Sequence, residues 1–407
     1  MRLALLILLL IPLAAPAKEI FRLDDPRGDD FGAGGLKYPT RDDLEPGSLD
    51  IEWFRADADS KGTWFRVRLG RRIPSPKGRV TSMGQEPLEK LLRTDFYTFN
   101  IDVYIDTDRI TGSGRMDTLP GRNVGVAAQG AWEKAVILTP RPQVARAYYL
   151  MELEKRAEDQ LREDRGRVTR EEVDAMRSRV EADLDAQVLF PQRIRVRGRE
   201  VHFFVPSSFL GGQARTEWGY SVMVTGCDIE EIARVVDITA GRPFNLMVIP
   251  VGPGLNRDRF GLVNEANLDQ PPIVDIVASS VAEQQRVLSD YDPRVPRLAA
   301  IPPISPSGLP PAPAPAGQLA ATTPAQPPGR GAPPASGSSA AAGPVAAAAP
   351  PARSGGNRDP GVAVTVPETT GRRTVPARLK TLNTLRSDGL ISEEEYQQLR
   401  RKILSEI

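Results

Sequence analysis

Between about residue 48 and residue 260, apolar and polar residues alternate in short runs separated by turn-forming residues. Alternation puts every second side chain on the same face of an extended chain, so these runs predict β-strands. The runs span residues 49–56, 62–69, 97–105, 123–129, 132–138, 193–197, 200–205, 217–224 and 234–238. Many short strands with turns between them are typical of a mostly β fold, and we expect an antiparallel, jelly-roll-like β-sandwich.

One segment inside this region has a helical pattern instead. Its apolar residues recur at spacings of three and four on either side of Gly166, and Thr169 with Glu172 forms a capping box. The recurring positions are Leu150, Leu153, Ala157, Leu161, Val173, Met176, Val180 and Leu184. We expect a charged helical hairpin over about residues 143–188, inserted between two strands. It is either a solvated protrusion or an arm that binds a partner protein.

The composition changes after residue 300. Residues 301–376 are mainly Ala, Pro, Gly and Ser, so they bury too little apolar surface to offset the entropy of ordering, and we expect a disordered linker. Residues 377–407 return to helical spacing. Because two such short helices are marginal alone, we expect this small hairpin to self-associate or to dock on a partner.

The N-terminus has the order of residues found in a secretory signal peptide. Arg2 precedes an apolar run, and a stretch of small residues ends at Ala17. We expect cleavage after Ala17, leaving a folded domain over residues 18–300 that is periplasmic, displayed on the cell surface or secreted. The apolar run is about half the ~20 residues that a membrane-spanning helix needs, and we expect no transmembrane segment after cleavage.

Charge and residue counts exclude several classes of function. Lys and Arg number 53 against 52 Asp and Glu, a balance that argues against nucleic acid as a partner. The single Cys227 excludes an internal disulfide, and the single His202 leaves too few partners for a Ser-His-Asp triad or a multi-histidine metal site. His202 lies in a strand-like run and is expected to be structural. We therefore expect no enzyme activity.

Acidic residues are the candidate metal ligands. In the alternating run that begins at Ile101, Asp102, Tyr104, Asp106 and Asp108 share the face opposite the core. Carboxylates that share a face repel unless they are solvated, protonated, paired or bridged by a cation.

A calcium loop is one reading of these residues. Asp106, Asp108 and Asp117 occupy positions 1, 3 and 12 of a loop counted like an EF-hand, although the intervening residues do not fit one. Asp29 and Asp30 belong to a second acidic cluster, in a glycine-rich loop. Calcium is the one cofactor these residues indicate, and solvated turn carboxylates are the alternative.

The aromatic residues are the candidate sugar-binding groups. All four tryptophans, including Trp218, lie in strand-like runs, where they either pack in the core or form an exposed platform that stacks on sugar rings. As ligand-binding residues we select Trp53, Trp64, Tyr104 and Trp132.

Several motifs taken together resemble the glucodextranase C-terminal-like module, a DOMON-like relative of carbohydrate-binding modules. The matching residues are Asp25-Pro26-x-Gly28-Asp29-Asp30-x-Gly32, Tyr38-Pro39-Thr40, Tyr104-Ile105-Asp106-Thr107-Asp108, Gly112-Ser113-Gly114, Leu119-Pro120-Gly121, Trp132-Glu133, Pro271-Pro272-Ile273-Val274-Asp275 and a helix from Gln285 to Tyr291. The resemblance covers roughly residues 18–295. It implies a β-sandwich in an exported protein that serves attachment to sugars or cell surfaces rather than hydrolysis.

The C-terminal hairpin resembles the SHOCT domain at Leu382, Leu385, Gly389-Leu390-Ile391 and Glu394-Glu395-Tyr396. The leading hypothesis is an exported, non-catalytic binding protein whose sandwich binds a glycan or cell-surface polymer and whose tail oligomerises or docks. One alternative is an envelope scaffold that uses the helical insertion for protein contacts. A second is an unrecognised glycan hydrolase or its accessory module.

Overall fold

The computed structural model describes residues 18–38, 42–80, 87–92, 94–227, 229, 271–292, 294–295, 297–313, 397 and 400. The expected signal peptide at 1–17 and the strand at 234–238 lie outside the described residues. So do the linker beyond residue 313 and all but two residues of the C-terminal hairpin.

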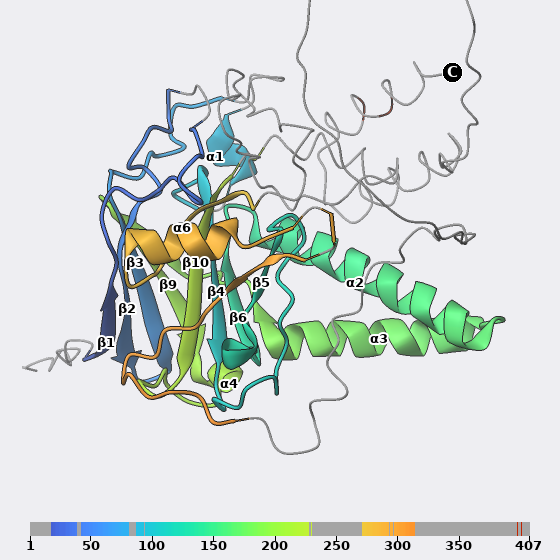
Figure 1. Cartoon of the computed structure of the whole chain (residues 1–407). Helices are drawn as coiled ribbons and strands as arrows, with labels where there is room; N and C mark the ends of the chain where they lie inside the picture. Colours follow the sequence, from blue (N-terminus) through green and yellow to red (C-terminus); the bar gives the residue numbers. More distant parts are fainter. Residues whose placement is uncertain are drawn as a thin grey trace, which may run out of the picture.

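Two five-stranded sheets form the body of the domain (Figure 1). The first sheet contains, in spatial order, β1 (Glu19–Asp24), β2 (Ile51–Asp59), β3 (Gly62–Leu69), β9 (Glu200–Pro206) and β8 (Ile194–Arg197). The second contains β11 (Ile273–Ile276), β10 (Gly219–Gly226), β4 (Phe99–Asp106), β6 (Lys134–Leu138) and β7 (Val188–Leu189). Within these two sheets all neighbouring strands are antiparallel except β6 and β7, which confirms the predicted mostly β, antiparallel fold.

The main core lies between the two sheets and follows the predicted alternation. Ile101, Val103 and Ile105 of β4 face this core, where they join Phe54 and Phe65 of the first sheet. All five side chains are fully buried. Burying apolar surface at about 25 cal/mol per Å² makes this contact the chief source of stability for the sandwich.

A second core covers the opposite face of the second sheet. Tyr104 and Trp132 lie in it together with Leu288 of α6 (Val281–Ser289). The short parallel pair β5 (Val124–Val126) and β12 (Ala299–Ile301) closes this layer. The second sheet is therefore covered on both faces, whereas the sequence pattern predicted a polar face for β4.

The inserted helical hairpin is present where the spacing predicts it. Helices α2 (Pro142–Arg165) and α3 (Arg170–Gln187) project from the body (Figure 1). Thr169 and Glu172 form the expected capping box at the start of α3. Only the base of the hairpin is anchored, through buried side chains such as Tyr149 and Leu184. The part beyond the base is solvated.

Three short helical elements connect the strands: α1 (Leu88–Leu91), the 3-10 turn η1 (Ala128–Gly130) and α4 (Ser207–Leu210). None of the described helices is both long and apolar enough to cross a membrane.

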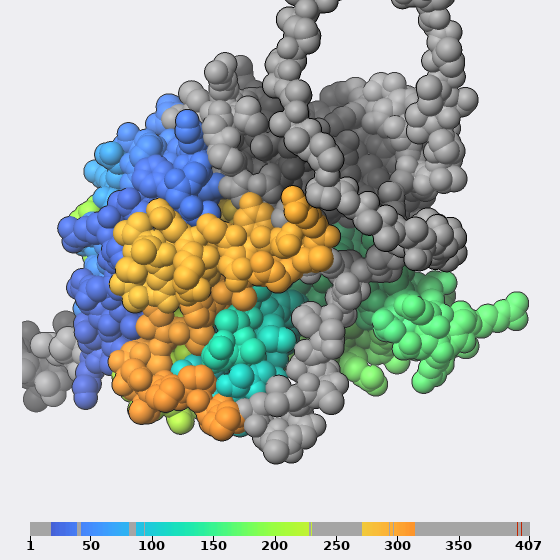
Figure 2. Space-filling model, in the orientation of Figure 1, coloured from blue at the N-terminus to red at the C-terminus, as the bar shows by residue number. Residues whose placement is uncertain are grey.

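The domain extends beyond the expected boundary at residue 300. Ile301 is buried, and Ile304 exchanges two backbone hydrogen bonds of 2.9 Å with Tyr220 of β10. Ala312 donates a backbone hydrogen bond of 2.7 Å to the carbonyl of Arg109. Figure 2 shows this segment, in orange, lying flush against the rest of the domain. Residues 301–313, which the composition places in the linker, are therefore part of the domain, because two isoleucines and the backbone pairing fasten them.

Candidate functional site

Carboxylates of the described residues gather at two places where their oxygens lie within 4.8 Å of one another. One group contains Asp106, Asp108 and Glu133, and the other contains Asp25, Asp29 and Asp275. Each group brings together residues that are distant in the sequence, and the two differ in how the carboxylates are satisfied.

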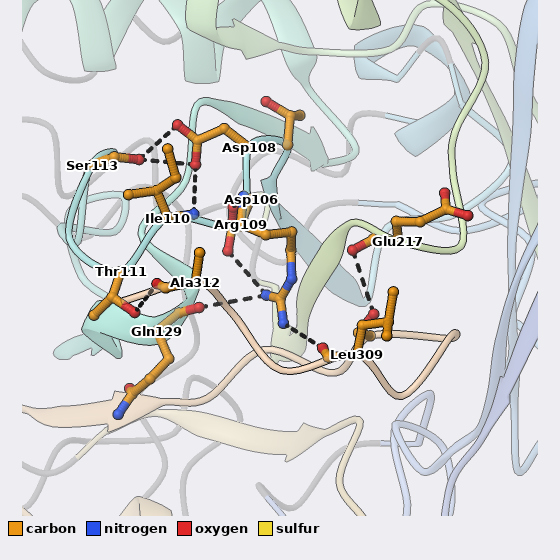
Figure 3. Close-up of polar contacts among 12 residues, drawn as sticks. Asp106, Asp108, Arg109, Ile110, Thr111, Ser113, Gln129, Glu217, Leu309 and Ala312 are labelled. Atoms are coloured by element: carbon orange, nitrogen blue, oxygen red, sulfur yellow. Dashed lines mark hydrogen bonds and ion pairs between the residues drawn. The ribbon is translucent and has the colours of Figure 1, made fainter. Parts of the chain in front are cut away.

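The first group lies at the end of β4, where the chain turns away from the sheet. Asp108 accepts hydrogen bonds from the backbone of Ile110 at 2.8 Å and from Ser113 Oγ at 2.8 and 2.9 Å (Figure 3). Glu133 accepts from the backbone and hydroxyl of Thr107 at 2.7 and 3.0 Å. Burial raises the pKa of the Glu133 carboxyl. Protein donors therefore satisfy these two carboxylates without an ion.

Arg109 neutralises the third member of this group. Its backbone and its Nη1 donate to the two carboxylate oxygens of Asp106 at 2.6 and 3.0 Å, and its Nη2 donates to the carbonyl of Leu309 at 3.1 Å (Figure 3). Arg109 adopts a left-handed backbone with φ of 58°. The Arg109 side chain thus links the end of β4 to residues 302–313, which we call the proline-rich segment.

The predicted calcium ligands are only partly brought together here. Asp106 and Asp108 meet, but Asp117 lies apart, with a half-exposed side chain that Arg115 holds in two hydrogen bonds of 2.9 and 2.6 Å. Glu133 takes the third place. The EF-hand count missed it because the chain returns to this point only at residue 133, just before β6, and not within one loop.

Beside Arg109 lies a pocket of about 560 Å³ between the end of β1, the start of α6 and the proline-rich segment. Its lining is mainly apolar, with Leu23, Val277 and Pro303 among the contributors, and Arg109 and Glu283 supply charge. Asp24 adds a second acidic side chain to the lining. A mainly apolar cavity with a few charged groups has the character of a small-molecule site.

The second carboxylate group lies where the loop after β1 meets β11. Asp25, Asp29 and Asp275 are 9%, 3% and 0% exposed. Burial, together with the neighbouring carboxylates, raises the pKa of Asp25 to about 9 and that of Asp29 to about 6. Burial and the charge of Asp25 also raise the pKa of Asp275 well above its usual range. The predicted metal ligand Asp30 follows Asp29 in the sequence but is not part of this group. Its carboxylate accepts hydrogen bonds from the Tyr38 hydroxyl and from the backbone of Gly47.

Two of the predicted ligand-binding aromatic residues lie inside the domain. Tyr104 and Trp132 are 1% and 0% exposed, and their rings contact each other with centroids 5.3 Å apart. Trp132 Nε1 donates to the carbonyl of Asp117 at 2.9 Å, and Arg115 lies 4.8 Å from the ring centroid. Neither ring offers surface to a ligand, because the second core covers this face of the sheet.

The other two lie on the outer face of the first sheet, under arginine side chains. The guanidinium of Arg22 lies 5.1 Å from the ring centroid of Trp53. Trp64 contacts Phe204 with centroids 5.3 Å apart, and Arg195 lies 4.7 Å from its ring. Trp53 and Trp64 are 8% and 9% exposed, so arginine side chains stand between these rings and the solvent.

The edge strand β8 adds unpaired positive charge to this face. Arg193, Arg195 and Arg197 are exposed, and among the described residues none of them has an acidic partner within ion-pair distance. Other arginines of the face are paired, as with Arg68, which contacts Glu52 at 2.7 Å and Glu200 at 2.9 Å. The alternation of arginines at 193, 195 and 197 is visible in the sequence, but the sandwich had to be known before these residues could be assigned to its outside.

His202 belongs to the same face and has the structural role expected of it. It is 7% exposed, and its Nε2 lies 3.0 Å from Glu200 Oε2. Burial lowers the pKa of this histidine, so the neutral form is favoured.

Comparison with known proteins identifies the domain. A family model described as the C-terminal binding module, SLH-like, of glucodextranase matches residues 20–303, well over half of the chain. The chain belongs to this family. The model of a second family, the SHOCT short C-terminal domain, matches residues 377–404. A search of curated proteins returned no match. Both resemblances read from the sequence motifs are confirmed.

The matched range covers most of the features described above, but the pocket beside Arg109 is lined in part by residues beyond residue 303. Both carboxylate groups, the outer face of the first sheet and the helical hairpin lie between residues 20 and 303. The family description is that of a binding module and names no reaction.

Proposed function

We propose that this protein is an exported, non-catalytic binding protein whose module attaches to a negatively charged polysaccharide of a cell surface. The proposed contact surface is the outer face of the first sheet. One observation carries the proposal: Arg193, Arg195 and Arg197 are exposed, have no acidic partner among the residues that the structure describes, and lie beside the ring pair of Trp64 and Phe204.

The chemistry of this face suits an acidic sugar polymer. A guanidinium donates two parallel hydrogen bonds to a carboxylate, phosphate or sulfate group, which gives arginine an advantage over lysine at such sites. Aromatic rings offer an apolar face to the C–H groups of a sugar. Arg193 lies 4.3 Å from the ring centroid of Phe204, so an arginine that turns to an anionic group would uncover a ring for the adjoining sugar.

The family description supports a binding role, since it assigns the related domain of glucodextranase to binding. The first of the two carboxylate groups also fits a module without hydrolytic activity. A glycosidase needs one carboxyl group free to donate a proton and a second free to attack or to activate water. Asp106 is paired with Arg109, Asp108 accepts from Ser113 and Glu133 accepts from Thr107, so each of the three already has a protein partner.

The test compares binding of the purified full chain to insoluble acidic and neutral polysaccharides. Replacing Arg193, Arg195 and Arg197 by Gln is expected to weaken binding to the acidic polymer about ten-fold or more, since each exposed ion pair contributes up to about 1 kcal/mol. Added salt should weaken binding of the unmodified protein in the same way.

A matched variant controls for the loss of charge. Arg167, Arg170 and Arg179 of the helical hairpin are also exposed, and replacing these three by Gln removes the same charge elsewhere on the domain. If both triple variants bind the acidic polymer equally weakly, the effect comes from the net charge of the protein and not from the proposed surface. Equal retention on neutral and acidic polymers would rule out the proposed ligand class.

A second candidate function is a scaffold for protein contacts, and the projecting hairpin favours it. Arg177 lies 3.6 Å from Glu154, so α2 and α3 are adjacent at these positions and a short turn can join them. Removing residues 156–175 would therefore shorten the hairpin and keep its buried base. Loss of a protein partner with unchanged polysaccharide binding would support the scaffold.

The tail has a separate proposed role. The SHOCT match supports self-association or docking through residues 377–404, which would cluster copies of the module at a surface. Analytical ultracentrifugation of the full chain, with and without these residues, tests this role. A monomer in both cases would exclude self-association.

A further inference from the structure

The second carboxylate group has more negative charge than the described residues neutralise. Asp25 and Asp29 come from the loop after β1, Asp275 from β11, and Asp50 directly precedes β2. All four are buried, and none forms an ion pair with a described Lys, Arg or His. Asp50 accepts a hydrogen bond of 2.8 Å from the backbone of Gly28.

Some oxygens of these carboxylates have no hydrogen-bond donor near them. Asp25 accepts from the backbone of Ala278 at 2.8 Å through Oδ1, but its Oδ2 has no partner. Asp29 is only 3% exposed, and neither of its carboxylate oxygens has a partner. An ionised carboxylate buried without a partner costs several kcal/mol. Such a group either takes up a proton, which the raised pKa values of Asp25 and Asp29 favour when no ion is bound, or meets a cation that compensates its charge.

Asp275 completes the site from the opposite side. Its Oδ2 accepts from the backbone of Ile51 at 2.6 Å and its Oδ1 accepts from the backbone of Ile276 at 2.9 Å. These bonds orient the carboxylate and leave lone pairs on both oxygens. Its ligand oxygen lies within 4.8 Å of those of Asp25 and Asp29.

The backbone holds the loop tightly against β11. Gly32 has φ of 56° and donates to the carbonyl of Val274 at 2.8 Å. A Cβ at this position would lie 2.6 Å from the carbonyl oxygen of Ile273, so a side chain has no room. Gln284 of α6 donates to the carbonyl of Asp29 and fixes the loop from a third element. The three carboxylates are therefore preorganised.

We propose that Asp25, Asp29 and Asp275 bind a calcium ion that joins the N-terminal loop to β11. Three carboxylates from separate segments supply oxygen ligands only, and the cluster has no nitrogen or sulfur donor of the kind that zinc or copper prefers. Calcium accepts six to eight oxygens in adaptable geometry, which suits a site assembled from a loop and a strand. Calcium also neutralises charge that no described side chain neutralises.

The first carboxylate group is the internal control. Asp106, Asp108 and Glu133 are as close together as the proposed ligands, but Arg109, Ser113 and Thr107 supply their hydrogen bonds. The carboxylate oxygens are therefore equally close together in both groups. The second group differs because oxygens of Asp25 and Asp29 have no hydrogen-bond partner, and this difference identifies it as the calcium site.

The experiment measures calcium binding and thermal unfolding of the full chain after treatment with EDTA and exhaustive dialysis. Titration with CaCl₂ in a calorimeter should show binding, and saturating CaCl₂ should raise Tm by about 5 °C or more, because the ion binds only the folded state. Absence of both binding and a Tm shift would overturn the proposal. An equal shift with MgCl₂ at the same concentration would overturn the choice of calcium.

Two aspartate variants locate the ion. D29N should abolish the calcium-dependent shift or weaken binding at least about ten-fold, since it removes a charged ligand. D108N should leave binding and shift unchanged. The reverse pattern would place the ion at the first group and refute the assignment.

D29N should fold without calcium, with Tm in EDTA at or above that of the unmodified protein, because the substitution removes a buried charge that lacks a partner. D25N provides a second variant should D29N not fold. Full calcium binding by a folded D25N would also refute the site.

Discussion

Asp102 and Arg122 form an ion pair inside the second core, with Arg122 Nε and Nη2 donating to the two carboxylate oxygens at 2.7 and 2.9 Å. The two residues are 1% and 0% exposed. Asp102 lies on the same face of β4 as Tyr104, which is buried in that core. The pair therefore allows a charged residue of β4 to be covered by a layer of apolar side chains.

Breaking this pair should destabilise the domain strongly. Asp102→Asn leaves the Arg122 guanidinium buried without its counter-charge, and we expect the free energy of unfolding to fall by about 3–5 kcal/mol. Asp102→Leu combined with Arg122→Met removes both charges and should cost clearly less. Urea unfolding followed by tryptophan fluorescence measures both variants, and a double variant as unstable as D102N would show that the pair itself is not the source of the loss.

Arg109 should have separable effects through its side chain and its backbone. R109A and R109G both keep the backbone hydrogen bond to Asp106 but lose the side-chain bonds to Asp106 and Leu309. Glycine adopts the left-handed backbone at residue 109 without strain. R109G is therefore expected to be about 1 kcal/mol more stable than R109A. Hydrogen exchange at the backbone amides of Leu309 and Ala312 should accelerate in both variants, and unchanged exchange there would mean that the Arg109 side chain does not hold this segment.

His202 should make the domain less stable at mildly acidic pH. Its folded pKa is lowered, so below its unfolded pKa of about 6.5 the unfolded chain binds a proton that the folded protein does not. Stability should thus be full above about pH 6.5 and fall as the pH drops below it. The charged groups that face this ring are Glu200, Arg66, Arg195 and Arg197.

The H202Q variant isolates this contribution. Glutamine does not titrate, so the difference in unfolding free energy between H202Q and the unmodified protein should change between about pH 7.5 and pH 5.5, in favour of H202Q at the acidic end. Effects of other titrating groups are common to both proteins and cancel in the difference. A constant difference would show that His202 does not contribute to the pH dependence.

The capping box of the hairpin should stabilise it locally. Thr169 Oγ1 accepts from the backbone of Glu172 at 3.3 Å, and Glu172 Oε2 accepts from the backbone of Thr169 at 2.9 Å. T169A should destabilise the start of α3 by about 1 kcal/mol and speed hydrogen exchange there. S178A, a change in the middle of α3, is the control and should leave exchange at the helix start as it is. Faster exchange throughout the sheets would contradict a local effect.

The fold was largely predictable because local periodicity decides it. The alternation at Ile101, Val103 and Ile105 identified a strand and its core-facing side, and the capping box at Thr169 located the second helix of the hairpin. Strand β1 was not predicted from the sequence. It is a mostly exposed strand in which only Phe21 of the six residues is buried, so it lacks the alternation of apolar and polar residues. Strands β7 and β12 are too short to show a period.

The candidate sites were predictable only in part, because they depend on contacts between distant segments. Asp29 was selected from its loop, but its neighbour Asp275 lies in a strand near the other end of the domain. Asp102 looked solvent-facing because its partner, Arg122, lies twenty positions further along the chain and outside the strand. The sequence also did not reveal that arginines cover Trp53 and Trp64, since that contact needs the register between strands.

The fastening of residues 299–313 affects how the module responds to mechanical force. A force applied at Pro313 acts first on the hydrogen bonds of Ala312 with Arg109 and Thr111, and next on those of Leu309 with Arg109 and of Ser307 with Thr216. It then reaches the hydrogen bonds of Ile304 with Tyr220, and last the pairing of β12 with β5. These contacts break one after another, and each released residue lengthens the chain before the load reaches the two sheets. The segment would thus lengthen under load before either sheet is strained.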